Sequence, residues 1–162
     1  MKKFAVIGQP IKHSLSPRIH SEFAKELGID ISYEAIEIAP KDFNSATKQL
    51  LENGYEGLNV TLPLKELAYS LADEVSQVGR ETRAVNTLWK EKGKIFADST
   101  DGKGLIEDLL NNQISLKDSN LIILGAGGAA RSILPSVLSL RPKRITLLNR
   151  TLEKSRALVD QF

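Results

Sequence analysis

Residues 120–130 read Asn-Leu-Ile-Ile-Leu-Gly-Ala-Gly-Gly-Ala-Ala, and they carry the strongest evidence for the fold class. A short apolar run, typical of a buried strand, leads directly into a glycine-rich turn. The residues after the turn are spaced as in a helix, and Arg144-Ile-Thr-Leu-Leu148 reads as a second strand. Strand, turn, helix and strand in this order predict a βαβ unit with two parallel strands.

The glycine turn matches the dinucleotide fingerprint G-x-G-x-x-G/A through Gly125, Gly127 and Ala130. The first glycine permits the tight turn, and the second lets the backbone approach a pyrophosphate at the helix N-terminus. A glycine-rich turn can also be purely structural, but the flanking strand and helix favour a nucleotide site. The predicted cofactor-binding residues of this loop are Gly125, Ala126, Gly127, Gly128 and Ala129.

The end of the second strand indicates which cofactor is bound. NAD sites usually place Asp or Glu there to hold the ribose 2′-hydroxyl. This chain has Asn149, Arg150 and Thr151 instead, followed by Lys154. A guanidinium group binds a 2′-phosphate with two hydrogen bonds, whereas a carboxylate would repel it. An exposed arginine at a helix start is the alternative, and the fingerprint favours NADP. These four residues complete the predicted cofactor site.

Toward the N-terminus, strand-like and helix-like segments alternate, which predicts an α/β protein. The pattern of strand-like and helix-like segments changes near residue 101, which predicts a domain boundary. One domain is expected over 1–101, a hinge helix and linker over 102–118, and an incomplete Rossmann-like domain over 119–162. The predicted elements are a strand at 4–7, a helix after the N-cap Ser16 ending at Gly28, a strand at 33–38, a helix at 43–51, a strand at 58–61, a hairpin of 85–89 with 95–97, and a helix at 104–110.

Composition excludes several classes of function. The 162 residues carry a net charge of +2, which is too small an excess for a nucleic-acid-binding face. Cysteine is absent, so disulfides, a thiolate nucleophile and a Cys-ligated zinc site are excluded, and two histidines are too few for a typical metal centre. No apolar run reaches the length of a secretory signal or a membrane span. We expect a cytoplasmic protein with no metal.

Four patches in the first domain contain polar residues that the packing of a hydrophobic core would not require. Each has a structural alternative: capping by Ser16, a solvated surface charge at Lys65, a satisfied internal asparagine at Asn86, and an Asx-turn at Asp101. Hydroxyl groups near a helix N-terminus also suit a carboxylate ligand. The patches are His13-Ser-Leu-Ser-Pro17, Asn59-Val-Thr-Leu-Pro-Leu-Lys65, Ala84-Val-Asn-Thr87 and Ser99-Thr-Asp-Gly102.

In order and spacing, these patches together with Gly-Ala-Gly-Gly-Ala and Asn-Arg-Thr resemble the shikimate dehydrogenase family over residues 8–151. The resemblance implies an N-terminal substrate domain with a mainly parallel sheet, an NADP-binding Rossmann domain and an active site between them. It further implies NADPH-dependent reduction of 3-dehydroshikimate to shikimate in aromatic amino acid biosynthesis.

Matched position by position, the resemblance implies that Ser14 and Ser16 hold the substrate carboxylate. Thr61, Asn86 and Asp101 would bind ring hydroxyls, and Lys65 would be the acid/base group. The residue types suit this chemistry, since hydride arriving at the C3 ketone leaves negative charge on oxygen, which an ammonium group can stabilise and protonate. Asp101 would keep the Lys65 amino group protonated and oriented toward the substrate.

The chain contains fewer strands than a complete dinucleotide domain, which is built from two βαβαβ halves. Family members continue through further strands and C-terminal helices. We therefore expect an incomplete Rossmann-like domain and doubt that the 162 residues are active alone. Three alternatives stay open: a truncated NADP enzyme, a non-catalytic ligand-binding fragment, and an NAD-using quinate/shikimate dehydrogenase. Homodimer formation is also left open by the sequence.

Overall fold

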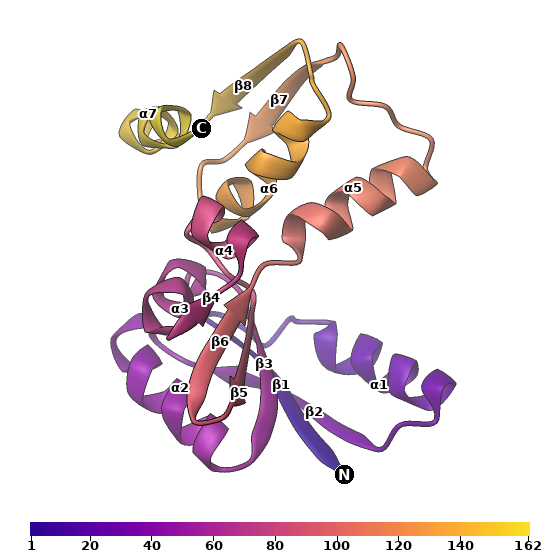
Figure 1. The fold of residues 1–162 in the computed structure, drawn as a ribbon, viewed down its shortest axis with the longest axis vertical. Helices are drawn as coiled ribbons and strands as arrows, with labels where there is room; N and C mark the ends of the chain where they lie inside the picture. The colour runs from indigo at the N-terminus through magenta and orange to yellow at the C-terminus, as the bar shows by residue number, and fades with distance from the viewer.

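The computed structural model describes Met1–Phe162 and contains two sheets, which divide the molecule into a lower and an upper unit (Figure 1). The N-terminal unit has six strands, and the C-terminal unit has two. In chain order the elements are β1 (Lys2–Gly8), α1 (Ser16–Leu27), β2 (Ile31–Glu37), η1 (Pro40–Asp42), α2 (Phe43–Glu52), β3 (Tyr55–Val60), α3 (Lys65–Leu71), β4 (Glu74–Val75), α4 (Gln77–Thr82), β5 (Thr87–Glu91), β6 (Lys94–Asp98), α5 (Asp101–Asn111), β7 (Asn120–Leu124), α6 (Gly128–Ser139), β8 (Arg144–Leu148) and α7 (Leu152–Gln161).

The larger sheet has the strand order β2-β1-β3-β5-β6-β4 and is mainly parallel, as predicted. Only β5 runs against both of its neighbours. It forms a hairpin with β6, and the turn between them has Lys92 and Gly93 at φ values of 50° and 80°. Positive φ at both central residues matches the twist of a two-residue hairpin, which explains the glycine.

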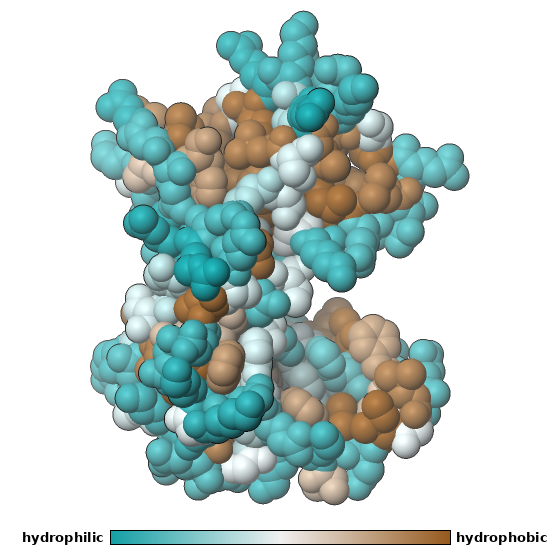
Figure 2. Space-filling view, viewed as in Figure 1, coloured by the Kyte–Doolittle hydropathy of each residue, from teal (hydrophilic) through white to brown (hydrophobic).

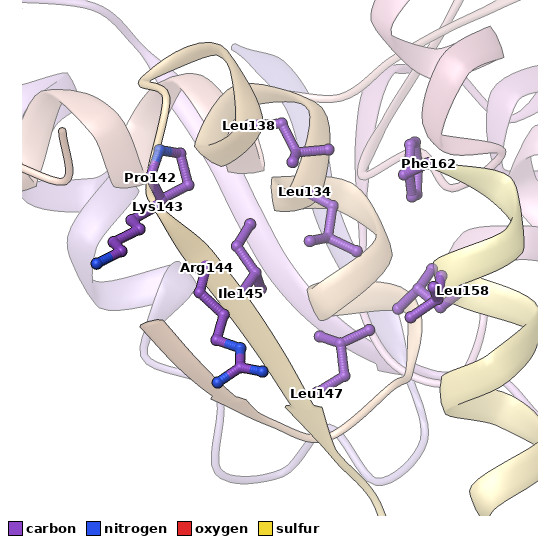
Figure 3. A pocket seen from close by; sticks show the side chains of 10 residues that line it. Leu134, Leu138, Pro142, Lys143, Arg144, Ile145, Leu147, Leu158 and Phe162 are labelled. Atoms are coloured by element: carbon purple, nitrogen blue, oxygen red, sulfur yellow. The ribbon is translucent and has the colours of Figure 1, made fainter. Parts of the chain in front are cut away.

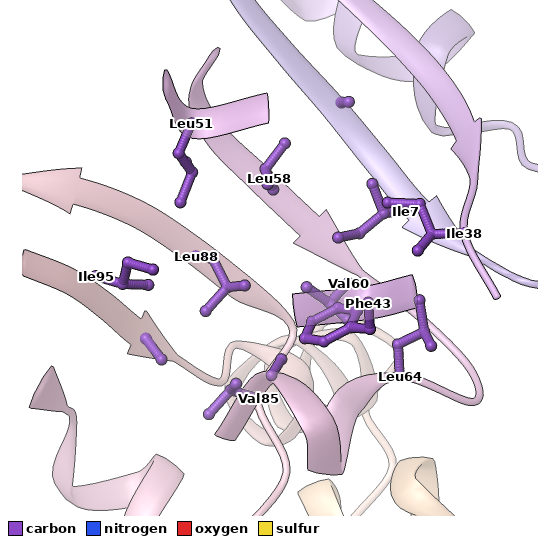
Figure 4. Packing of buried hydrophobic residues seen from close by; sticks show 13 residues of the cluster. Ile7, Ile38, Phe43, Leu51, Leu58, Val60, Leu64, Val85, Leu88 and Ile95 are labelled. Carbon is purple, nitrogen blue, oxygen red and sulfur yellow. The ribbon is translucent and has the colours of Figure 1, made fainter. Parts of the chain in front are cut away.

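The core of the N-terminal unit lies between the larger sheet and the helices α2 and α3. Its centre is formed by alternate residues of the strands, such as Leu58 and Val60 of β3, which pack against Phe43 of α2 and Leu64 just before α3 (Figure 4). Phe43 and Leu64 are completely buried. The large, closed core gives the strand ends that carry the polar patches a rigid base.

The C-terminal unit is a two-stranded parallel sheet with α6 and α7 beside it (Figure 1). Its core is small and comprises Ala126, Ala130, Leu134 and Leu158. Alternate strand residues on the other face are exposed, with Ile122 at 66%, Leu124 at 80% and Leu148 at 51%. The expected βαβ unit is therefore confirmed, and one face of its sheet is apolar and open.

Two expectations about helix starts are wrong. Ser16 is the first residue of α1 and caps nothing with its side chain, because the helical hydrogen bonds already begin at the Leu15 carbonyl, which accepts from the amide of Ile19. Asp101 does not lie in an Asx-turn but is the first residue of α5, which begins three residues earlier than Gly104. In addition, Val85 and Asn86 precede β5.

The segment between Lys65 and Thr82 forms α3, β4 and α4, which the sequence reading did not assign. None of the helices in the molecule has both the length and the apolar character needed to cross a bilayer.

Candidate active site

An ion pair between Lys65 and Asp101 lies where two helices begin. Lys65 is the first residue of α3 and Asp101 the first of α5, and Lys65 Nζ donates to Asp101 Oδ2 at 2.5 Å. The two side chains are only 12% and 22% exposed. A lysine at a helix N-terminus opposes the helix dipole. Its presence there is explained by the carboxylate that faces it, and the catalytic role of the pair stays a prediction.

Asn86 fixes the second oxygen of Asp101. Its Nδ2 donates to Asp101 Oδ1 and to Thr100 Oγ1, both at 2.9 Å, and its Oδ1 accepts from the backbone amide of Thr100 at 3.1 Å. Both amide hydrogens of Asn86 are therefore engaged within the protein. Asn86 lines the hollow beside Lys65, and its main structural effect is to orient Asp101, so a contact between Asn86 and a ligand stays a prediction.

Two adjoining hollows of about 240 and 260 Å³ bring the predicted substrate residues together. Ser16 and Thr61 line both of them. The first hollow also contains Lys65 and Asp101, and the second contains Ser14, whose Oγ accepts from the backbone amide of Ser16 at 3.3 Å. The two hollows together are called the polar depression: the Ser14 hydroxyl group lines one of them, and the charged pair lines the other. Figure 2 shows the molecule hollowed between its two units on the side of α1 and α5.

Three residues at this site were not among the predicted site residues, although Asn59 lies within one of the predicted polar patches. Asn59 and His20 line the hollow, and Tyr33 donates its hydroxyl hydrogen to Asn59 Oδ1 at 2.7 Å. Burial raises the pKa of Tyr33 to about 12, although a hydrogen bond with Ser16 partly opposes this shift. Tyr33 is therefore a phenol at neutral pH and can act as a donor. The Asn59 amide group then points its NH₂ toward the Asn86 carbonyl oxygen, at 3.4 Å.

The His20 ring stacks on Tyr33 with a centroid distance of 4.2 Å and an interplanar angle of 5°. Burial lowers the pKa of His20, so that its neutral form is favoured beside the lysine. A sequence signal existed for Asn59, because Asn59 and Thr61 alternate at the end of one strand and such residues share a face. No signal was available for His20 and Tyr33, since their stacking depends on the packing of α1 against β2.

The glycine loop offers the open backbone that a dinucleotide requires. Gly125 has a φ of 110°, which only glycine adopts readily. A β-carbon at Gly125 or Gly127 would meet no protein atom within 4 Å, so the space above the loop is free for a ligand. The loop leads into α6, whose first backbone amides face that space. This geometry fits a pyrophosphate.

The groups predicted to select the cofactor lie at the end of β8. Arg150, Thr151 and Lys154 are exposed, and Asn149 Nδ2 donates to the Thr151 carbonyl oxygen at 2.7 Å. Asn149 thus shapes the turn, while the two basic side chains are free to meet a phosphate. No carboxylate occurs in residues 149–152, so nothing there would repel it.

A further hollow of about 290 Å³ lies between α6, β8 and α7 (Figure 3). Aliphatic side chains such as Leu134, Ile145 and Leu158 dominate its lining. Its only charged lining residues are Lys143 and Arg144 at the rim. It offers no arrangement for acid/base chemistry, so the polar depression beside Lys65 is the better candidate active site.

A lysine–carboxylate pair next to a dinucleotide-type glycine loop defines a class of two-unit α/β proteins. Comparisons with known proteins give the family. The model described as the shikimate dehydrogenase substrate binding domain matches residues 6–88, and the one described as shikimate / quinate 5-dehydrogenase matches residues 105–162. The chain belongs to the shikimate dehydrogenase family.

Individual relatives agree with this assignment. The chain is 45% identical over 162 residues to the shikimate dehydrogenase (NADP(+)) of Methylococcus capsulatus, with 99% of this chain and 58% of the relative covered. The solved shikimate dehydrogenase of Aquifex aeolicus superposes with a TM-score of 0.93 at 34% identity and covers 100% of this chain and 60% of that one. The Thermus thermophilus enzyme in complex with NADP(H) and shikimate gives 0.90 at 36%, covering 99% and 60%. The chain thus spans about three fifths of the length of these relatives.

Proposed function

We propose that this chain carries the substrate site and the adenosine-phosphate side of the cofactor site of an NADP-dependent shikimate dehydrogenase. The observation that carries the proposal is the Lys65–Asp101 pair, placed between a row of hydroxyl groups and the start of the glycine-loop helix. The substrate would be shikimate or 3-dehydroshikimate, bound with its carboxylate toward Ser14 and Ser16.

The cofactor, when bound, supplies a hydride to the C3 ketone of 3-dehydroshikimate. Lys65 then donates a proton from Nζ to the oxygen that has gained the negative charge, and a hydroxyl group results. Asp101 keeps Lys65 charged and aimed, and Asn86 keeps Asp101 in place. Thr61 and Asn59 lie on the same wall and would bind the ring hydroxyls. In the reverse direction Lys65 accepts the proton.

The residues of the second unit fit NADP better than NAD. The Gly125–Ala129 loop and the first amides of α6 would hold the pyrophosphate, and Arg150 with Lys154 would hold the 2′-phosphate. An NAD-using quinate/shikimate dehydrogenase would be expected to have a carboxylate at the end of β8, where this chain has Asn149 and Arg150.

The direct test is calorimetric titration of the purified chain with shikimate and, separately, with NADP⁺, combined with an assay of NADP-dependent shikimate oxidation. Both ligands should bind. The double change Ser14→Ala with Ser16→Ala should weaken the binding of shikimate but not the binding of NADP⁺. Binding of both ligands without turnover would support the fragment alternative. Binding of neither would contradict the proposed function.

A chimera gives the catalytic test. Residues 1–162 would be joined to the part of the Methylococcus capsulatus relative that this chain does not span. In that protein Lys65→Ala should lower kcat by roughly two to four orders of magnitude, as expected for loss of a general acid. Lys90→Ala is the matched control, because Lys90 lies on β5 away from the site. Turnover within a few-fold of the parent chimera would remove Lys65 from the mechanism.

A further inference from the structure

Helix α6 lies against Lys65 of the Lys65–Asp101 pair, and the glycine fingerprint does not explain this contact. A β-carbon built on Gly128, the first residue of α6, would lie 3.5 Å from Cβ and 3.7 Å from Cδ of Lys65. Gly128 occupies one of the variable positions of G-x-G-x-x-A, where the cofactor alone does not require glycine. The start of α6 therefore rests on the aliphatic part of the Lys65 side chain.

A closer contact involves Gly102, which directly follows Asp101 in α5. A β-carbon on Gly102 would lie 2.2 Å from Ser136 Oγ, 2.9 Å from Ser136 Cβ and 3.3 Å from the Ser132 carbonyl oxygen. Rotation of the Ser136 side chain would relieve only the contact with Oγ. The contacts with Ser136 Cβ and the Ser132 carbonyl oxygen would remain too close, so a side chain at residue 102 would require α5 and α6 to shift. Ser136 lies about two helical turns beyond Gly128 on α6.

Helix α6 is also held by polar contacts to α3 and α7, and α7 in turn is bonded to α4. The Arg131 Nε lies 3.9 Å from Glu66 Oε1 of α3, and Arg131 donates to Gln161 Oε1 of α7. Gln161 in turn donates to the carbonyl oxygen of Glu81, in α4, at 2.8 Å. The Arg131 side chain is only 19% exposed. A helix held at several points cannot easily move away from a new side chain in α5.

We propose that Gly102 is a positioning residue. Its lack of a side chain lets α5 lie directly against Ser136 of α6, and this contact sets where Asp101 stands relative to Lys65. The position of α6 against α5 then determines the geometry of the Lys65–Asp101 pair. The catalytic meaning of this contact rests on the proposed function, but its geometry can be tested without any ligand.

The experiment uses NMR of the chain labelled with ¹⁵N-lysine. The signal of the Lys65 amino group is identified by its loss in Lys65→Arg. Gly102→Ala should shift or broaden this signal, because Asp101 moves with α5. Gly104→Ala is the matched control: Gly104 is exposed in the same helix, and a β-carbon there meets nothing within 4 Å. The Lys65 signal of Gly104→Ala should match that of the parent chain.

Adding Ser136→Gly to Gly102→Ala should return the Lys65 signal toward its original position, because it removes both atoms nearest to the new methyl group. An unchanged signal in folded Gly102→Ala would overturn the proposal, as would a shift that Ser136→Gly does not reverse. If Gly102→Ala does not fold, Ser136→Gly alone carries the test. The vacated contact should then move the Lys65 signal, and an unmoved signal would overturn the proposal.

Shikimate added to the same samples separates the two proposals. If shikimate disturbs no signal, the proposed function fails while the result for Gly102 stands. If shikimate binds but the Lys65 signal does not respond to Gly102→Ala, the positioning role fails while the proposed function stands.

Discussion

At the scale of single residues, Arg150 is the sharpest test of cofactor choice. Arg150→Ala should weaken NADP⁺ binding by roughly tenfold to a hundredfold, which corresponds to the loss of about 1.5–3 kcal/mol from a charge-assisted hydrogen bond. NAD⁺ binding should change little, because NAD⁺ has no 2′-phosphate. Calorimetric titration of each cofactor measures the difference.

Arg156→Ala provides the control for this measurement. Arg156 is an exposed arginine farther along α7, so its removal changes the net charge equally but leaves the end of β8 intact. If Arg150→Ala weakened both cofactors to the same degree, Arg150 would be a structural residue of the turn.

His20 should make the stability of the protein depend on pH. Its pKa is lowered in the folded state by burial, so the unfolded chain takes up the proton first as the pH falls. The contribution of neutral His20 to the free energy of unfolding is therefore fully present above the ordinary histidine pKa of about 6.5. It is lost as the pH falls through the pKa that His20 has in the folded protein. The stability lost in His20→Gln should therefore be largest near neutral pH and should shrink at acidic pH.

Urea unfolding at several pH values measures this effect, and His13→Gln is the control because His13 is exposed. A difference between His20→Gln and the parent chain that does not vary with pH would show that only the stacking on Tyr33 is lost.

The individual site residues were largely predictable, but their interactions were not. Two adjoining hollows are lined by Ser14, Ser16, Thr61, Lys65 and Asp101, whereas the roles of these residues toward a ligand stay predictions. The sequence could not show that the amide hydrogens of Asn86 are used within the protein, because this depends on how Thr100 and Asp101 approach it in space.

At the scale of the elements, the short helix α4 depends on its cap. Ser76 Oγ accepts from the backbone amide of Gly79 at 3.1 Å and donates to Asp98 Oδ1 of β6 at 2.5 Å. Ser76→Ala should lower the free energy of unfolding by about 0.5–2 kcal/mol. Ser70→Ala is the control, since Ser70 is exposed in α3 and only bonds to a carbonyl of its own helix. Equal effects of the two changes would argue against a capping role.

Most long elements were predicted because their periodicity is strong, as in α1, α2 and the two strands of the C-terminal unit. The segment from α3 to α4 was not, because each of its elements is seven residues or shorter and the hydrophobic pattern is too brief to identify. Tertiary contacts hold it instead, such as the backbone bonds from Asp73 to Ile95 and from Ser76 to Ala97.

At the scale of the whole molecule, the open face of the small sheet should make the chain associate. Ile122, Leu124 and Leu148 are exposed and project from one face of this sheet, and Figure 2 shows apolar surface on the upper unit. Sedimentation should show a mass that rises with concentration. Ile122→Thr with Leu148→Thr should reduce the association, because threonine suits strands but buries less apolar area.

Leu110→Gln is the control for this prediction, because it removes an exposed leucine from α5 and leaves the small sheet unchanged. If Leu110→Gln reduced the association as much as the double change in the sheet, the contact would lie elsewhere. A mass that stays monomeric at all concentrations would contradict the expectation.

The division of the molecule also has an evolutionary consequence. The residues proposed for substrate all precede residue 102, and those proposed for the cofactor all follow residue 124. Selection can therefore alter substrate preference and cofactor preference through separate stretches of a gene. The contact of Gly102 with Ser136 is an exception, because it joins the two stretches. Among descendants of a common ancestor, a larger residue at position 102 should be inherited together with a smaller one at position 136.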